Sequence, residues 1–135
     1  MGVRVAADEG VCCADDVSGL AAEKAADVIV LKLMQVGGIA AASRIALAAS
    51  QHGLEVCLTT GMDSSIATAA ALHLSAALQP NTDSGFSTLS LLEGDLVPDK
   101  LREGPWMKVP EGPGLGVTLD RSSRFLGTAE VHERV

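Results

Sequence analysis

Four ionisable residues lie at or near the ends of short apolar runs: Asp8, Glu9, Lys32 and Asp63. Asp8 and Glu9 follow the run from Val3 to Ala7 directly. Paired carboxylates at the carboxyl end of a strand lie where α/β sheets and barrels place their sites. Carboxylate oxygens suit a hard cation such as Mg²⁺. An acidic turn that caps the next element would have the same sequence, so both interpretations stay open.

Lys32 interrupts an otherwise apolar run that extends from Val28 to Leu33. Lysine is almost never fully buried without a partner. If this run is a strand inside a barrel, we expect Lys32 to project among other site residues. Desolvation there would lower the pKa of its ammonium group toward the range that a general base needs. The alternative is a lysine at a strand end whose ammonium group reaches solvent.

Asp63 lies in the segment Thr60-Gly61-Met62-Asp63-Ser64, between an expected strand end and an expected helix start. A catalytic carboxylate and a helix-capping carboxylate fit this position equally well. The pair Gly37-Gly38 can expose backbone amides to an anion, but a turn at a helix start explains it as well. His73 lies inside an Ala-rich stretch and is predicted to be structural, while His52 and His132 are interpreted as helix-end and tail residues.

Short apolar runs alternate with Ala-rich helical stretches along the first two thirds of the chain. Strands are predicted at 3–7, 28–33 and 55–59, with a less distinct fourth between 83 and 89, and helices at 15–24, 39–52 and 64–78. The repeat of roughly 25–30 residues is the size of a βα unit. Four units make half of an eight-stranded barrel, for which about 250 residues are usual. A small doubly wound sheet would show the same alternation. Residues 93–117 are rich in Gly and Pro and are predicted to form a loop-rich closing segment.

The composition excludes several classes of protein. The chain has 135 residues, of which 47% are apolar, so one domain with a core is expected. A net charge of −7 argues against nucleic acid or an acidic membrane surface as a partner. Cys12, Cys13 and Cys57 do not suit a disulfide framework or a zinc site. Because no secretory signal is visible at the N-terminus, we expect a cytoplasmic protein.

Several segments in one register resemble the muconate-lactonizing and mandelate racemase type of the enolase superfamily. They are Ala-Ala-Asp8-Glu9, Ala26-Asp27-Val-Ile-Val-Leu-Lys32-Leu-Met-Gln-Val-Gly37-Gly38, Thr60-Gly-Met-Asp63-Ser-Ser-Ile66 and Val109-Pro110-Glu-Gly-Pro113-Gly114-Leu-Gly116. The 24 positions from Asp8 to Lys32 match that family's pattern. The resemblance covers residues 3–120. It implies an α/β fold that is the C-terminal half of a TIM-type (β/α) barrel, with a domain at 1–120 and a polar tail at 121–135.

The resemblance also implies roles for the candidate residues. Asp8 is expected to bind Mg²⁺, with Glu9 supporting the site. Lys32 and Asp63 are expected to be catalytic, and Gly61 and Met62 to contact the substrate. The implied reaction is Mg²⁺-dependent proton abstraction next to a carboxylate, as in cycloisomerases, epimerases and o-succinylbenzoate synthase. Gly10 in place of the family's usual Ser, and Asp63 in place of its usual Glu, leave the substrate open.

The same resemblance leads us to expect half of a complete enzyme. The family's N-terminal capping domain, its strand-two lysines and its other metal carboxylates have no counterpart in these 135 residues. We therefore expect the chain alone to bind Mg²⁺ weakly and to be inactive on a small carboxylate substrate. The expected partner is the missing N-terminal half. The alternative is a non-catalytic half-barrel module that self-associates.

Overall fold

The structure is a computed structural model that describes residues 2–98, 101–103 and 105–126. The prediction for the tail at 121–135, including His132, lies largely outside these residues. The elements in chain order are β1 (Ala6–Ala7), α1 (Ala14–Ala22), β2 (Val28–Lys32), α2 (Ile39–Gln51), β3 (Glu55–Thr59), α3 (Ser65–Leu78), the 3₁₀ helix η1 (Ser87–Leu91), β4 (Arg102–Glu103) and β5 (Trp106–Met107). Strands alternate with helices through α3, as the sequence predicted.

The first three strands form one parallel sheet in the order β1-β2-β3. Ala6 pairs with Val28, and Lys32 at the end of β2 pairs with Thr59 at the end of β3. Each strand is followed by a helix that returns the chain to the opposite end of the sheet, which is the βα arrangement. The carboxyl ends of the three strands therefore meet at one edge, where Asp8, Lys32 and Thr60 lie.

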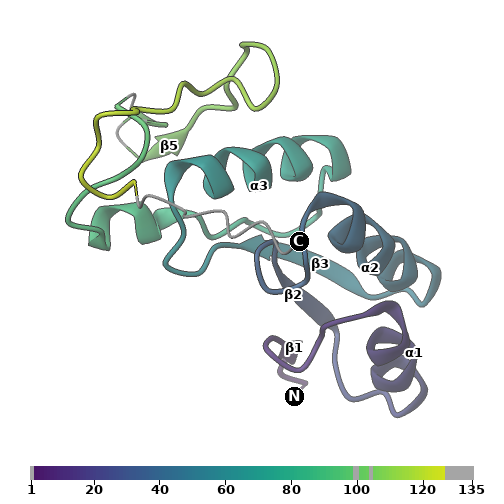
Figure 1. Cartoon of the computed structure of the whole chain (residues 1–135). Coiled ribbons are helices and arrows are strands. Elements are labelled where there is room, and N and C mark those ends of the chain that lie inside the picture. The colour runs from purple at the N-terminus through teal and green to yellow at the C-terminus, as the bar shows by residue number, and fades with distance from the viewer. Residues whose placement is uncertain (1, 99–100, 104, 127–135) are drawn as a thin grey trace, which may run out of the picture.

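The helices cover one face of this sheet. In β2, Ile29 and Leu31 have no exposed surface, whereas their neighbours Val28 and Val30 are half-buried. Helix α2 contacts both α1 and α3, so the three helices lie in a row around the sheet (Figure 1). A doubly wound sheet would need helices on both faces. The one-sided arrangement instead fits half of a (β/α) barrel, with Val28 and Val30 on the face that points to the barrel interior.

The predicted fourth strand between residues 83 and 89 is wrong as a regular strand. Gly85 forms a single parallel bridge with Thr59, and η1 begins at Ser87. The Gly85 backbone donates to Leu58 and accepts from Thr60, so residue 85 still holds the fourth strand position. This short segment is also fixed by side chains, because Thr82 donates to the Val56 carbonyl. The expected order of four strand positions is kept, although the last of them is one residue long.

The first strand is also shorter than predicted. Parallel pairing to β2 begins only where the Val5 carbonyl accepts from the amides of Asp27 and Val28. Val3 precedes that point and is 85% exposed, because nothing described pairs with it. The first helix begins and ends slightly earlier than predicted, at Ala14–Ala22 in place of 15–24.

Three glycines shape the two ends of α2: a pair at its start and one after its end. Gly37 and Gly38 have φ angles of +90° and +100°, and Gly38 is the N-cap residue of α2. Side chains other than glycine rarely adopt this conformation. Gly53 follows the C-cap His52 with φ +71°, as predicted for a C′ glycine. The double glycine is thus explained by the turn that leads from Lys32 into α2.

The closing segment is mostly irregular, as predicted, but it contains a short antiparallel hairpin of β4 and β5. It packs on the sheet and helices through Leu101, which is buried, and through Met107, Val109, Leu115 and Val117, which are partly buried. Among the helices of the described residues, none is long and apolar enough to cross a membrane.

A candidate half active site at the carboxyl ends of the strands

Lys32 is held by two carboxylates at the carboxyl ends of β1 and β2. Its Nζ lies 2.8 Å from Asp8 Oδ1 and 2.9 Å from Oδ2, so both oxygens of Asp8 contact the ammonium group. Glu9 Oε1 lies 3.3 Å away. The Lys32 side chain is 15% exposed, against 46% for Asp8 and 77% for Glu9. The fold thus brings Lys32 to two candidates, Asp8 and Glu9, that lie 24 and 23 positions before it in the sequence.

The electrostatics of Lys32 differ from the expectation. Its hydrogen bond to Asp8 raises the pKa of the ammonium group. Desolvation acts in the opposite direction, and the hydrogen bond to Glu9 and the charges of both carboxylates raise the pKa further. The prediction that desolvation lowers the pKa of Lys32 is therefore wrong for this structure, because the paired carboxylates outweigh burial. In this state Lys32 is protonated at neutral pH.

Asp8 and Glu9 do not cap the following helix, which was the alternative interpretation of this acidic turn. That role belongs to Asp16, whose Oδ2 accepts hydrogen bonds from the Cys12 and Cys13 amides at 2.8 and 2.9 Å. These backbone bonds lower the pKa of the Asp16 carboxyl, since they stabilise its charged form. With the cap supplied by Asp16, the side chains of Asp8 and Glu9 are directed to Lys32.

Asp63 lies in the loop between β3 and α3, at the same end of the sheet. Its Oδ2 accepts a hydrogen bond from the Gly61 amide at 3.0 Å, so its half-buried carboxylate folds back on its own loop. Ser64, and not Asp63, is the N-cap residue of α3. Met62 is 61% exposed, and Gly61 is half-buried. In the part of the chain that the structure describes, Asp63 shares no hydrogen bond with Lys32, Asp8 or Glu9.

The carboxylates present do not make a complete Mg²⁺ site. Across the described residues, no group of three or more His, Cys, Asp or Glu side chains is placed to hold a metal ion. Asp8 and Glu9 have the oxygen donors that Mg²⁺ prefers, but Mg²⁺ binds in an octahedron and Lys32 already neutralises Asp8. The chain by itself therefore does not fit the metal; it has one strand-end carboxylate that could join ligands from elsewhere.

His52, His73 and Cys57 make contacts within the scaffold. His73 Nε2 lies 3.2 Å from the Leu115 carbonyl and connects α3 to the closing segment. His52 Nε2 lies 3.2 Å from Ser18 Oγ, between α1 and the end of α2. Cys57 donates its thiol to the Asp83 carbonyl, and the three cysteines are free. The structural roles predicted for His52 and His73 are confirmed by these contacts.

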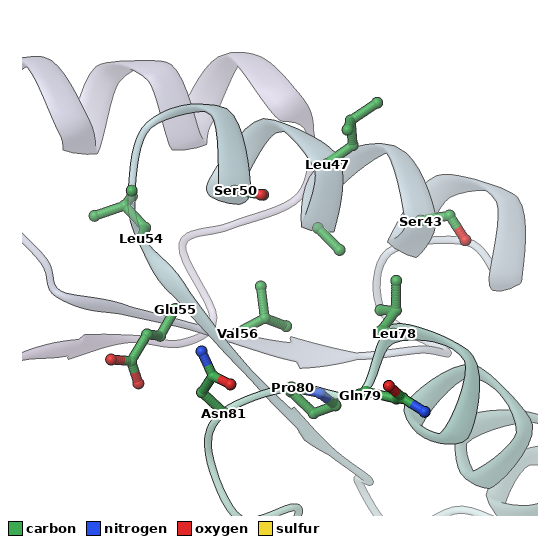
Figure 2. Close-up of a pocket in the computed structure, with 12 residues that line it drawn as sticks. Ser43, Leu47, Ser50, Leu54, Glu55, Val56, Leu78, Gln79, Pro80 and Asn81 are labelled. Carbon is green, nitrogen blue, oxygen red and sulfur yellow. The ribbon is translucent and has the colours of Figure 1, made fainter.

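A hollow lies at the opposite end of the sheet. About 620 Å³ in volume, it lies between α2 and the segment that follows α3, against the first residues of β3. Figure 2 shows Leu47, Leu54, Val56 and Leu78 around it, together with the polar side chains of Glu55 and Asn81. None of the predicted site residues lines it. The amino ends of barrel strands usually serve stability, so this hollow is not the candidate site.

Sequence reasoning missed Asp95. Its two carboxylate oxygens accept from the Ser65 amide at 3.0 and 3.1 Å, and it also bonds the Ser65 hydroxyl. The bond joins the closing segment to the first turn of α3, directly after the loop that carries Asp63. No local pattern could have indicated it, because 30 positions separate the two residues.

Comparison with known proteins agrees with this geometry. Residues 1–123 match the family model described as Enolase C-terminal domain-like. The chain is 38% identical over 119 residues to a chloromuconate cycloisomerase of Cupriavidus pinatubonensis, covering 85% of this chain and 32% of that protein. It is 38% identical over 100 residues to an o-succinylbenzoate synthase of Thermobifida fusca, covering 73% of this chain and 31% of that one.

Solved structures show the same relationship. A muconate cycloisomerase from Azorhizobium caulinodans superposes with a TM-score of 0.79 at 27% identity, covering 90% of this chain and 35% of that one. A dipeptide epimerase from Cytophaga hutchinsonii, complexed with Mg and the dipeptide D-Ala-L-Val, gives 0.78 at 28% identity and covers 90% of this chain and 33% of that one. This chain spans about a third of the length of each relative. It belongs to the enolase C-terminal domain-like family, in the muconate-lactonizing and mandelate racemase branch of the enolase superfamily.

Proposed function

We propose that this chain supplies Lys32, Asp8, Glu9 and Asp63 to the active site of a Mg²⁺-dependent isomerase or lyase that acts on a small carboxylate substrate. The observation that carries the proposal is the position of Lys32, whose ammonium group lies 2.8 Å from Asp8 at the carboxyl ends of parallel strands. Catalytic residues of barrel enzymes come from the ends of several strands at this face. Relatives named as cycloisomerases, an o-succinylbenzoate synthase and dipeptide epimerases support this class of reaction.

Each residue has a role that follows from its surroundings. Lys32 carries its proton at neutral pH, so it can return a proton to a substrate carbon or stabilise negative charge on the substrate. To act as a base, Lys32 must first lose its proton. The negative charge of the neighbouring carboxylates opposes this loss, so that charge must first be neutralised. In the complete enzyme, a bound Mg²⁺ would supply stabilisation of negative charge on the substrate. Asp8 would be one of its ligands and Glu9 would hold Asp8 and Lys32 in place.

The loop Gly61-Met62-Asp63 is the proposed contact to the substrate. Its Met62 side chain projects from the loop with 61% of its surface exposed. The carboxylate of Asp63 is held by the Gly61 amide and can accept a proton or orient a polar group. One carboxylate pair and one lysine are not a complete site, so the isolated chain is proposed to be inactive.

A chimeric barrel tests these roles. The segment of the C. pinatubonensis chloromuconate cycloisomerase that matches this chain is replaced by this chain, and cycloisomerisation and proton exchange in D₂O are measured. We expect Lys32→Met to lower the rate by about 10²- to 10⁴-fold, the usual effect of removing an acid or base. Lys108→Met, at an exposed lysine of the closing segment, is the matched control and should leave the rate unchanged.

Two results would contradict the proposal. A folded chimera whose Lys32→Met variant keeps full activity would remove Lys32 from the chemistry. Mg²⁺-dependent proton exchange by the 135-residue chain alone would contradict its proposed inactivity. The second candidate function is a self-associating module without catalysis. It is favoured by β1, whose outer edge pairs with no strand among the described residues.

A further inference from the structure

Neither edge strand of the parallel sheet pairs with a further strand in the described part of the chain. Along β1, the Val5 carbonyl accepts from the Val28 amide. Backbone groups of a parallel strand alternate in direction, so the N–H and C=O of Ala6 point away from β2. At the opposite edge of the sheet, beside β3, the Gly85 backbone donates to Leu58 and accepts from Thr60. By the same alternation, the N–H of Ser84 points away from β3.

The helix-free face between these edges is partly apolar. Val28 and Val30 of β2 and Cys57 of β3 are half-buried there, while Ile29, Leu31 and Leu58 on the helix side have no exposed surface. Ala6 of β1, which pairs with Val28 on this face, is exposed. An unpaired strand edge beside an apolar face is a template for another strand.

We propose that two copies of this chain close into one eight-stranded barrel, with the β1 edge of each copy pairing in parallel with the residue 84–86 edge of the other. Each copy has four strand positions, β1, β2, β3 and Gly85, which is half of the eight that fill a small barrel. A two-fold axis parallel to the strands preserves their direction, so both new pairs are parallel and the assembly is closed.

The partner that best fits both edges is a second copy of this chain. A partner at β1 must offer a parallel edge, and the same chain has one at 84–86 on the same sheet. Pairing of β1 with its own copy would be antiparallel, since a two-fold axis perpendicular to the sheet reverses the strand. That arrangement would leave the 84–86 edge and the apolar face of Val28 and Val30 open. The closed barrel covers all of them and places both Asp8–Lys32 pairs at one mouth.

Proline substitutions separate the possibilities, because proline removes one N–H and is tolerated on a strand edge that faces solvent. Ala6→Pro removes an outward N–H of β1, and Ser84→Pro removes one of the other edge. Ser84→Ala is the control for the lost contact of Ser84 Oγ with Ser75 Oγ, which is 3.0 Å long. Ala7→Pro is the opposite control, since the Ala7 N–H points to β2 and its loss should destabilise the chain itself.

Sedimentation equilibrium of the 135-residue chain is the measurement. We expect the unsubstituted chain and Ser84→Ala to sediment at twice the monomer mass of 13.8 kDa. Ala6→Pro and Ser84→Pro should each sediment as monomers with unchanged helical circular dichroism. If Ala6→Pro loses its helical signal, Ser84→Pro decides.

Any of three outcomes would overturn the inference: a monomeric parent chain, assemblies that grow with concentration, or a Ser84→Pro variant that remains a dimer. The inference rests on the sheet edges and not on the proposed catalysis. If the chain is a monomer, the catalytic roles tested by the chimera are not contradicted. If the chimera is inactive, the proposed dimer is not contradicted.

Discussion

Asp95 is a polar residue whose removal should strongly destabilise this chain. It accepts hydrogen bonds from the Ser65 amide, the Ser65 hydroxyl and the Leu96 amide, the last at 2.7 Å. Ser65 is 4% exposed, so water cannot easily replace the lost acceptor. Because Ser64 makes no side-chain cap, Asp95 is also the side-chain acceptor for the first turn of α3.

The size of the effect follows from these contacts. Loss of a helix cap costs about 1 kcal/mol, and each buried group left without a partner costs about 1–3 kcal/mol. Asp95→Ala should therefore lower the free energy of unfolding by about 2–4 kcal/mol in all, a large part of the roughly 5–15 kcal/mol typical of a domain. Asp95→Asn keeps the shape and one acceptor oxygen and should cost less than half of that.

Urea unfolding followed by circular dichroism measures the difference. Asp120→Ala is the matched control, because Asp120 also accepts from a serine amide and hydroxyl, those of Ser122, but in an exposed turn. We expect the order of stability parent, Asp120→Ala, Asp95→Asn, Asp95→Ala. If Asp95→Ala is no less stable than Asp120→Ala, then the closing segment does not hold α3 and the argument from burial is refuted.

Three further predictions follow from other parts of the molecule. Asp8→Asn should lower the pKa of Lys32, measured by NMR at its Cε, whereas Asp63→Asn should not. Because the pKa of Lys32 is raised in the folded chain, Lys32 contributes to stability below the unfolded lysine pKa of about 10.4. This contribution is lost as pH rises through the folded pKa. Leu58→Ala, at a side chain with no exposed surface, should cost about 2–5 kcal/mol in chemical denaturation, and Val30→Ala on the helix-free face clearly less; equal losses would show that both faces are covered. Gly38→Ala should lower stability by about 1–2 kcal/mol in thermal unfolding because Gly38 has φ +100°, while Gly19→Ala in the open middle of α1 should raise it by about 0.5–1 kcal/mol; a stabilised Gly38→Ala would contradict the backbone argument.

Local patterns predicted the regular elements well where side chains alternate or repeat strongly. β3 has the predicted bounds, α3 begins one residue later than predicted, and α2 ends at Gln51, shortly before Gly53 with its positive φ angle. The fourth strand was wrong because a residue such as Gly85 pairs through its backbone and leaves little pattern in the side chains. The hairpin of β4 and β5 was missed for a similar reason. Each strand is only two residues long and lies in a segment rich in Gly and Pro, so no side-chain alternation indicates it.

The candidate site was predicted in its residue types and in its place on the fold. Lys32 was expected to project among other site residues, and its Nζ lies 2.8 Å from Asp8 Oδ1. The sign of the pKa shift was not predictable, because it depends on whether carboxylates contact the ammonium group or leave it desolvated. That balance is decided by distances of a few ångströms between side chains 24 positions apart.

The sequence by itself determined the βα order, the family and the identity of the residues that could do chemistry, because these depend on short-range patterns and on motifs in one register. Only the tertiary structure decided that the helices cover one face, that Asp95 holds α3, and that Asp8 and Glu9 contact Lys32. The physical reason is the same for all three. Each depends on contacts between groups that are far apart in the sequence and close together in the fold. A local sequence pattern does not predict such contacts.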